Sequence, residues 1–432
     1  MTQAYVEAFG AFAANGGSEG PAWLPPLRRA AMDRFGVLGF PTPKNEDWHF
    51  TSVAPIAERE FRAGTSGTPA VSPADVARFT FGHPEWPRLV FVNGRFAPGL
   101  SQLPSLPGLE LLDLARAWRD SPELLERHLT RVANYEQAAF TALNTAFLRD
   151  GAVVRIAADV ALPSPVHLLF VAAGDVADRV SHPRTLVVAE RHARATVIES
   201  YVALGGASGY FTNAVTEAVV GPGATLTHLR LQRESADAFH VGTVQASQER
   251  DSHFVSFSLA TGGRLARTNI YTVLGGAGSG ATLNGLYMLG GTQHVDQQTR
   301  IEHAEPNTFS REVYKGILDG ASHGVFNGKV YVRPEAQKTD GKQENNNLLL
   351  SDQARVDTKP QLEIFADDVK CTHGATVGRL DDTALFYMKS RGIGAASARR
   401  LLTYAFAAGV IETIEEESVR NELERLALER YV

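Results

Sequence analysis

The spacing of hydrophobic and polar residues divides the chain into three parts, and the long middle part has the pattern of short β-strands. From about residue 151 to 380, runs rich in Val, Ile, Leu, Thr and Tyr are broken by Gly, Asp, Asn and Ser, as in GAVVRIAADV, RTLVVAE and PQLEIFADDVKC. Helical spacing is almost absent there, so no crossover helices join these strands. A doubly wound sheet is therefore excluded.

A crude repeat runs through the strand-rich part. An apolar pair, a turn of small residues and another strand recur, for example in VVAERHARATVIE and VVGPGATLTHLRL, at irregular intervals of roughly 15 to 45 residues. Stacked strands with tight Gly, Asp and Asn corners favour a β-helix, whose turns bury their apolar faces on one another. A β-sandwich and a β-barrel are the alternatives that this pattern leaves open.

The first 150 residues or so are predicted to be mainly helical. Two segments with helical spacing, 22–43 and 121–148, are bounded by proline, and Ser121 is a suitable N-cap for the second. Between them, PRLVFVNGRF predicts a β-hairpin, because its Asn-Gly pair is a strong type I′ turn signal. Helix returns near residue 394, where SARRLLTYAFAAGVIETI has Ser397 as a candidate N-cap and EESVRNELERLALERYV follows with one apolar stripe.

Composition narrows the class of protein. The 432 residues are 21% charged and 44% hydrophobic with a formal net charge of −6, which fits a globular protein and gives no basic surface for nucleic acid. The single cysteine cannot form an internal disulfide, which indicates a reducing compartment. We see no signal peptide and no apolar run long enough to span a bilayer. We therefore expect a cytoplasmic protein that binds neither nucleic acid nor membrane.

The only cysteine, Cys371, lies two residues before His373 in the stretch VKCTHGATVG. If this stretch continues the strand pattern, both side chains point to the same face, about 7 Å apart at Cα. That spacing suits two ligands on one soft or borderline metal ion, or a thiol whose pKa is lowered by a protonated imidazole. Two ligands do not complete a zinc site, so the others would come from elsewhere, including another subunit. The alternative is a buried structural cysteine beside a hydrogen-bonded histidine.

Other candidate residues are weaker. NEDWHFTSV (45–53) is interpreted as an aromatic anchor for the N-terminal region, with a polar cluster as the alternative. The chain has no GxxxxGK[ST] motif, so we expect no nucleotide hydrolysis. The acid pairs at 367–368 and 381–382 are interpreted as turn carboxylates rather than catalytic acids. No short-range ligand spacing links the histidines of the strand-rich part, which we expect on the surface or hydrogen-bonded in the core: His228, His240, His253, His294, His303 and His323.

Residues 348–402 (LLLSDQARVDTKPQLEIFADDVKCTHGATVGRLDDTALFYMKSRGIGAASARRLL) closely resemble the C-terminal half of the SufB/SufD family of iron–sulfur cluster assembly proteins. NEDWHFTSV resembles the family's N-terminal acidic-x-Trp-aromatic-Thr element, so the resemblance covers nearly the whole chain. Within the family the chain is more similar to SufD than to SufB. Met388 stands in the FY-x-x-x-RG segment where SufB-like chains carry a cysteine, and no thiol other than Cys371 exists to pass persulfide along the chain.

The resemblance implies a fold and a role. The fold is mainly β: a right-handed parallel β-helix (151–380) between an N-terminal mainly helical domain (1–150) and a C-terminal helical domain (381–432). The role is that of a non-catalytic scaffold in the SufBCD complex, paired with SufB through the β-helix and holding the SufC ATPase through the C-terminal helices. His373, with Cys371 as the second candidate, would supply ligands or an iron-entry point for the nascent Fe–S cluster at the SufB–SufD interface.

The resemblance also implies SufC docking by residues 391–414, with packing of their apolar stripe on the chain's own β-helix as the alternative. The docking candidates are Arg391, Leu401, Leu402, Tyr404 and Phe406. A flavin on the assembled complex is a further implied cofactor, whereas we expect none on the isolated chain. The isolated chain is expected to self-pair as a homodimer through its open strand edge. Two competing functions, a β-helix carbohydrate-active enzyme and a stand-alone metal-dependent hydrolase, would need a groove of acids and aromatics or a three-ligand set, and neither pattern is found in the sequence.

Overall fold

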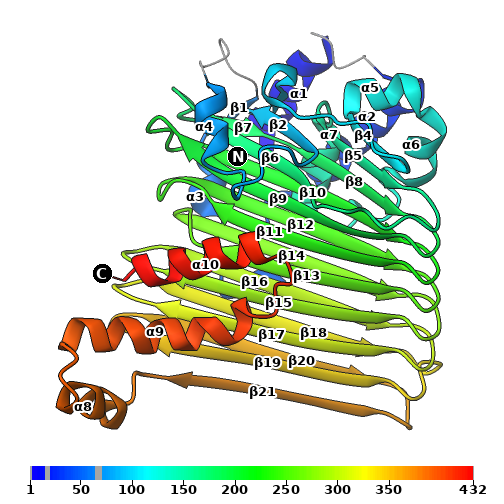
Figure 1. The fold of residues 1–432 in the computed structure, drawn as a ribbon. Coiled ribbons are helices and arrows are strands. Elements are labelled where there is room, and N and C mark those ends of the chain that lie inside the picture. Colours follow the sequence, from blue (N-terminus) through cyan, green and yellow to red (C-terminus); the bar gives the residue numbers. More distant parts are fainter. Residues whose placement is uncertain (1, 15–19, 64–70, 432) are drawn as a thin grey trace.

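The computed structural model describes residues 2–14, 20–63 and 71–431, and it shows a long stack of β-strands with helices from both ends of the chain lying against it (Figure 1). Two sheets face each other along the whole stack. The space between them, here called the lumen, is filled by side chains. Among the described residues, no helix is both long enough and apolar enough to cross a bilayer.

The strands form two sheets, called sheet A and sheet B. Sheet A consists, in spatial order, of β20 (Arg355–Ile364), β18 (His323–Val332), β16 (His294–His303), β14 (Leu265–Leu274), β12 (Phe239–Gln248), β10 (Phe211–Val220), β8 (Arg184–Ala189), β5 (Gly151–Ile156) and β4 (Leu109–Asp113), with β7 (Arg179–Ser181) and β1 (Arg62–Ala63) beside β10. Sheet B consists of β21 (Lys370–Gly378), β19 (Asp340–Leu349), β17 (Phe309–Leu318), β15 (Gly280–Leu289), β13 (His253–Ala260), β11 (Thr225–Arg233), β9 (Arg194–Leu204), β6 (Val166–Ala173), β2 (Arg88–Val92) and β3 (Arg95–Phe96).

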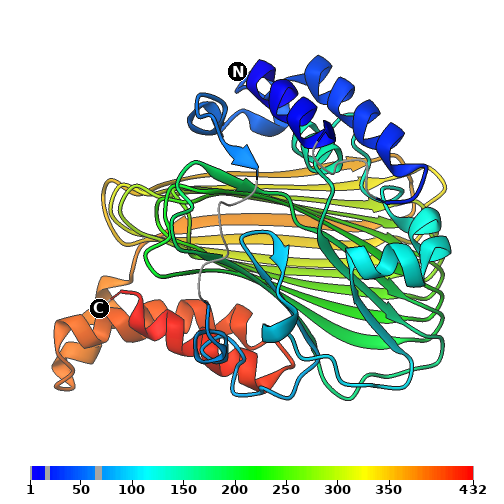
Figure 2. The same cartoon turned by 90° about the horizontal axis from the view of Figure 1, so that it is seen from above.

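The helices lie in the first and last parts of the chain. They are α1 (Thr2–Ala14), α2 (Leu24–Leu38), α3 (Ala54–Ala57), α4 (Pro73–Ala77), α5 (Leu114–Asp120), α6 (Pro122–His128), α7 (Ala139–Ala146), α8 (Asp382–Ser390), α9 (Ala395–Ile411) and α10 (Glu417–Glu429), with the 3-10 turns η1 (Glu46–Trp48) and η2 (Pro98–Leu100). From above, the N-terminal helices lie over one sheet and α8 to α10 lie against the other (Figure 2).

The strand order is that of a parallel β-solenoid of about 8 turns, because the chain alternates between sheet A and sheet B and pairs each strand with the one a turn earlier. Only β3 and β4, at the N-terminal end, pair antiparallel with their neighbours. This confirms the predicted β-helix over the sandwich and the barrel. The repeat is more regular than the sequence pattern indicated, since paired positions such as His294 and His323 are 29 residues apart. Strands of successive turns pair at a nearly constant separation along the chain, although the side chains at paired positions often differ in type.

The corners between strands use residues in left-handed backbone conformations, as the Gly, Asp and Asn pattern predicted. Asp251 and Asn307 have φ values of 55° and 58°. At the corners of two successive turns, Gly320 adopts φ 62° and lies so near Gly291 that a Cβ there would come within 2.9 Å of the Gly291 backbone. Glycine therefore permits both the conformation and the close stacking of turns.

The lumen carries an apolar core and also a set of buried polar side chains. Val187, Phe254, Leu283 and Phe326 belong to the main apolar cluster, each with no more than 1% of its surface exposed. Glutamate, glutamine and asparagine side chains lie among them on strands β16 to β19. Because a buried polar group loses its water, each of these needs a partner inside the protein.

The outer faces of both sheets are covered in part by helices. On sheet A, α2 and α7 pack with Phe211 and Phe239 in a cluster rich in aromatic rings. On sheet B, α9 and α10 bury Val410 and Leu423 against strands β11 to β17. Strands that are covered on both faces have nearly continuous apolar sequences. This explains the weak alternation of apolar and polar residues in the strand-rich part.

Two elements of the N-terminal region differ from the sequence prediction. The helical segment expected at 121–148 is split into α6 and α7, and Thr130 between them has a φ of 65°. The break occurs because Glu217, on β10, accepts hydrogen bonds from the backbone N–H groups of Thr130, Val132 and Ala133. A continuous helix would have used those groups internally.

The predicted hairpin at residues 87–96 is confirmed, since β2 and β3 pair antiparallel around Asn93 and Gly94 with φ values of 50° and 74°. The N-terminal region also supplies strands to the solenoid, because β2 pairs parallel with β6. The C-terminal helices begin at the boundary of the predicted domain 381–432, before the helical spacing recognised near residue 394. Asp381 caps α8, and α9 starts at Ala395, so Ser397 lies inside a helix and is not its N-cap.

Candidate functional site

The last turn of the solenoid, β20 and β21, forms the lower end of the stack in Figure 1, and no later turn in the described chain covers the lumen there. Every earlier turn is covered by the turn that follows it. In the described part of the chain no strand pairs with the outer edge of β20 or β21. Val377 and Ile364, which lie at this end, have 51% and 36% of their surface exposed. This open end is the site at which sequence reasoning placed Cys371 and His373.

Register shows which way these two side chains point. In the ladder between β19 and β21, Cys371 lies opposite Gly341 and His373 opposite Gln343. Gly341 and Gln343 face the lumen, where Gln343 is 1% exposed. Cys371 and His373 therefore share the lumen-facing side of β21, as the strand pattern predicted.

The Cys371 thiol lies in apolar surroundings. It is half-buried and packs with Leu362 and Val369 against a cluster that contains Val330 and Ala366. Burial raises the pKa of this thiol above its ordinary 9.0, and nearby Asp340 raises it further, against the opposing effect of the Gly341 backbone N–H. The expected lowering of the thiol pKa by an imidazole is therefore wrong for this chain by itself, since desolvation of the thiolate dominates.

His373 has the opposite environment, because its ring is exposed at the open end. Within the described part of the chain, no side chain forms a hydrogen bond to it. Nor do any three His, Cys, Asp or Glu side chains come together among the described residues in a way that could hold a metal ion. Cys371 and His373 thus lie two residues apart on the lumen-facing side of β21, with the His373 ring exposed to solvent.

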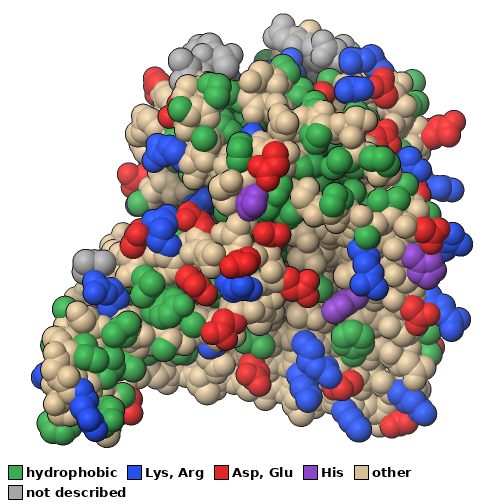
Figure 3. All heavy atoms as spheres, in the orientation of Figure 1, with side chains coloured by type: hydrophobic (Ala, Val, Ile, Leu, Met, Phe, Trp, Pro, Cys, Tyr) green, Lys and Arg blue, Asp and Glu red, His purple; other side chains and the backbone are tan. Residues whose placement is uncertain are grey.

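A second exposed surface lies on α8 and α9. Phe386 and Tyr387 have 72% and 58% of their surface exposed, and Leu401 has 42%. Hydrophobic side chains gather over this projecting part of the molecule in Figure 3. Arg391 lies with its guanidinium 5.2 Å from the centre of the Tyr387 ring. Sequence reasoning missed Phe386 and Tyr387 because it placed the docking element at residues 391–414, although LFYMK is an apolar run that could have indicated them.

The other residues predicted at this surface face inward to different degrees. Tyr404 and Phe406 pack against the cluster that joins α9 to sheet B, and Leu402 is half-buried. Lys315 on β17 donates a hydrogen bond to the Phe406 carbonyl oxygen at 2.8 Å and lies over its ring. The alternative of intramolecular packing therefore holds for Tyr404 and Phe406, whereas Leu401 stays accessible.

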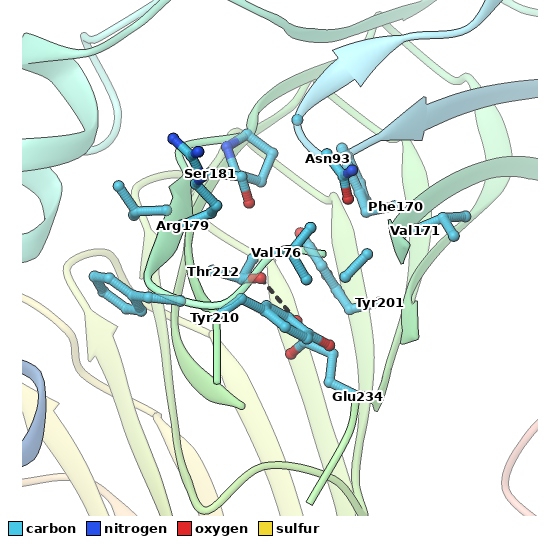
Figure 4. Close-up of a pocket in the computed structure, with 15 residues that line it drawn as sticks. Asn93, Phe170, Val171, Val176, Arg179, Ser181, Tyr201, Tyr210, Thr212 and Glu234 are labelled. Carbon is cyan, nitrogen blue, oxygen red and sulfur yellow. Dashed lines mark hydrogen bonds between the residues drawn. The ribbon is translucent and has the colours of Figure 1, made fainter. Parts of the chain in front are cut away.

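A cavity near the first turns of the solenoid is too small for a substrate. It encloses about 30 Å³ between Phe170, Val176, Tyr201 and Tyr210, which is room for only one or two waters. Its polar wall is already paired, because Thr212 donates to Glu234 at 2.7 Å (Figure 4). Nothing in this cavity resembles the groove of acids that a carbohydrate-active enzyme needs.

The histidines of the strands are mostly buried and hydrogen-bonded, as predicted for His240 and His303. Nδ1 of His240 lies 2.6 Å from Oε2 of Glu234. Burial lowers the pKa of the His240 and His303 imidazoles, and that of His303 is about 4. Sequence reasoning missed one pair: Nδ1 of His294 lies 3.0 Å from Nδ1 of His323 on the outer face of sheet A. Their separation of 29 residues equals one solenoid turn, and this spacing could have indicated that the two side chains meet.

The segment NEDWHFTSV is the aromatic anchor that the sequence predicted. The Trp48 ring lies 3.6 Å from the Arg267 guanidinium of β14 and contacts Phe140 of α7. Thr51 donates to Asp296 of β16 at 2.6 Å. The segment therefore fastens the N-terminal region to the outer face of sheet A.

Two family models together match the chain from residue 1 to residue 406, with only residue 169 between them. Residues 170–406 match the model described as "SUF system FeS cluster assembly, SufBD core domain". Residues 1–168 match the model described as "SufBD protein N-terminal region". The two matches adjoin within the first turns of the solenoid.

Individual relatives agree with the family models. A SufBD family protein of Synechocystis is 35% identical over 92% of this chain and 88% of its own length. The iron-sulfur cluster assembly protein SufD of Escherichia coli is 34% identical over 89% of this chain and 88% of its own length. SufD of Bacillus subtilis is 27% identical over 93% of both chains.

Proposed function

The chain belongs to the SufBD family of iron–sulfur cluster assembly proteins, and from that premise we propose that it is a non-catalytic scaffold subunit of a cluster-assembly complex. In this proposal it pairs with a SufB-type subunit through the open end of the solenoid and docks a SufC-type ATPase through α8 and α9. His373, with Cys371 as the second candidate, holds iron or the nascent cluster at the interface between the two solenoids.

The open end is the observation that carries the proposal. A strand with an unpaired edge presents free N–H and C=O groups and tends to add another strand. Pro360 interrupts the donor row on β20, whereas β21, from Lys370 to Gly378, contains no proline. Backbone pairing with a partner is therefore favoured along β21, the strand that carries Cys371 and His373. Without a SufB-type partner, the same edge would support a homodimer.

The incomplete ligand set fits an interface. Two lumen-facing ligands at the end of a solenoid can be joined by ligands from a facing subunit, which completes the coordination of iron or of a cluster. His373 is the stronger candidate because its ring is exposed, whereas the Cys371 thiol is half-buried and burial raises its pKa. Metal binding would have to displace the thiol proton.

The test is anaerobic cluster reconstitution on the complex co-expressed with SufB and SufC. We expect His373→Ala to lower the iron and sulfide retained per intact complex, and Cys371→Ala to lower it less. Thr372→Ala is the matched control, because Thr372 lies between them and faces outward from the same strand. Unchanged iron and sulfide in both variants, with the complex still assembled, would remove the two residues from the proposed site.

The α8–α9 surface is proposed as the ATPase-docking element because its exposed rings have no covering partner in the described chain. Removing everything after Arg391 is a poor test, since α9 and α10 also cover sheet B. Charged substitutions at Phe386 and Leu401 leave that packing in place. We expect Phe386→Asp with Leu401→Asp to abolish co-purification of the SufC-type ATPase. Val37→Asp, at a comparably exposed residue of α2, should leave co-purification unchanged. Retained co-purification would contradict the docking assignment.

The remaining parts of the proposal concern cofactors and location. The cluster or its iron is cargo shared with the SufB-type subunit, and a flavin is proposed only for the assembled complex. We propose the cytoplasm as the location, because the free Cys371 thiol suits a reducing compartment.

A further inference from the structure

A column of polar side chains runs through the lumen to the open end, one from each of the last three turns of sheet B. Glu312 on β17 pairs in register with Gln343 on β19, and Gln343 pairs in register with His373 on β21. Glu312 and Gln343 are each 1% exposed. The column therefore leads from the closed interior directly to the exposed imidazole.

Glu312 is a buried carboxyl group without an ion pair in the described part of the chain. Burial raises its pKa to about 7, against the lowering effect of the hydrogen bond from Gln343. Its Oε1 atom has no hydrogen-bond partner among the described residues. Such a carboxyl group destabilises a fold, and a buried group of this kind close to a site is a candidate for a functional role.

Gln343 is held by Glu312 in one orientation. Its Nε2 donates to Oε2 of Glu312 at 2.7 Å. Because the amide nitrogen and oxygen lie on opposite sides of the carbonyl carbon, Oε1 of Gln343 then points away from Glu312. This Oε1 atom is buried and has no partner in the described part of the chain. It is an unused acceptor directly beneath the last turn.

The opposite wall of the lumen makes room for this side chain. Gly328 on β18 faces Gln343, and a Cβ at Gly328 would lie 2.3 Å from the Gln343 Nε2 atom. Pro360 on β20 takes the equivalent position in the last turn, opposite His373. A larger residue at position 328 would therefore displace the amide from the column.

We propose that Gln343 is a positioning residue for His373: when the exposed ring turns toward the lumen, the unpartnered Oε1 of Gln343 accepts a hydrogen bond from one ring N–H. The other ring nitrogen is then bare and faces the open end, and Glu312 sets the amide in the orientation that this requires. Metal-ligating histidines are commonly oriented in this way through their second nitrogen. The ligand that the bare nitrogen takes is iron or the nascent cluster, and this part of the inference rests on the proposed function.

The test reads the tautomer of His373 directly, on the full chain labelled with 15N-histidine. The His373 signals are assigned by their loss in His373→Gln. In the wild type we expect one dominant neutral tautomer, with well-separated resonances for the two ring nitrogens. Gln343→Met, which keeps the length of the side chain and removes the acceptor, should move the two resonances toward each other. Gln343→Leu is the second variant if the first does not yield folded protein.

Two further variants separate positioning from general loosening of the turn. The exchange Glu312→Gln with Gln343→Glu keeps an acceptor beneath His373 and should restore the separated resonances. Gln297→Met removes another 1% exposed glutamine from the lumen, on β16, and should leave the His373 resonances unchanged. Resonances unmoved by Gln343→Met, or moved equally by Gln297→Met, would overturn the inference.

The same variants in the co-expressed complex then report on the proposed function separately. With His373 as a ligand, we expect Gln343→Met to weaken retention of ferrous iron by roughly tenfold or more, the usual size of such effects. If the tautomer changes while iron retention does not, the hydrogen bond stands and the ligand role of His373 fails.

Discussion

The buried carboxyl group of Glu312 makes the stability of this protein depend on pH in a predictable direction. Burial raises the pKa of Glu312 to about 7 from 4.5, so the folded chain holds the proton more tightly than the unfolded chain does. Protonation therefore stabilises the fold. The contribution is complete below pH 4.5 and is lost as the pH rises through 7.

The size of the effect follows from the difference between the two pKa values. Each unit of pKa corresponds to about 1.4 kcal/mol, so the whole contribution is about 3 kcal/mol. Between pH 5.5 and pH 8 the loss in the free energy of unfolding is about 2 kcal/mol. Glu312→Gln keeps the shape of the side chain and removes the titration. When the pH is raised from 5.5 to 8, we therefore expect the free energy of unfolding of this variant to rise by about 2 kcal/mol relative to that of the wild type.

The measurement is urea unfolding of the full chain at pH 5.5 and pH 8, for wild type and Glu312→Gln. Other titrating groups are common to both proteins, so they cancel in the difference. Glu344→Gln is the matched control, because Glu344 lies next to Gln343 on β19 but is exposed. A difference between Glu312→Gln and wild type that does not change with pH would refute the reasoning, since it would mean that Glu312 is ionised in the fold at both pH values.

Three further predictions concern other parts of the fold. Glu217→Ala should lower the free energy of unfolding by about 3–5 kcal/mol, because it leaves the buried Arg184 guanidinium without its charged partner and three backbone N–H groups without their acceptor. A loss below 1 kcal/mol in urea unfolding would contradict this. Alkylation of Cys371 by iodoacetamide should still accelerate above pH 9, because burial raises the pKa of the thiol, and a rate that levels off below pH 8 would refute it. Gly94→Ala should cost about 1–2 kcal/mol in thermal or urea unfolding, since φ is 74° and the new Cβ would lie 2.9 Å from Ser181; full stability would show that the hairpin can shift.

Local signals predicted those elements whose partners are close in sequence. The Asn93-Gly94 turn is confirmed because its two strands are adjacent and the turn type depends on those two residues. The common face of Cys371 and His373 is confirmed because a strand repeats every two residues wherever it lies. The left-handed backbone at the corners is confirmed for the same reason, because Gly, Asp and Asn adopt it more readily than other residues do.

Predictions failed where a distant residue competes for a local group. The expected helix at 121–148 has the right spacing, but the Glu217 carboxylate, a strand residue far along the chain, takes three of its N–H groups. One of the alternatives for Cys371 was a thiol with a pKa lowered by the neighbouring imidazole. Its pKa is instead set by Leu362 and Val369, which reach it only in the folded solenoid.

By itself, the sequence determined a strand-rich core between helical ends, the turn residues at its corners and a thiol–imidazole pair on one face of the last strand. These follow from backbone preferences and from the period of two, which act over a few residues. The tertiary structure alone decided that this pair lies at an open lumen, that Gln343 and Glu312 stand in line behind His373, and that Phe386 and Leu401 stay uncovered. Each of these depends on which residues one turn of the solenoid brings together, and that pairing is set by the register between strands.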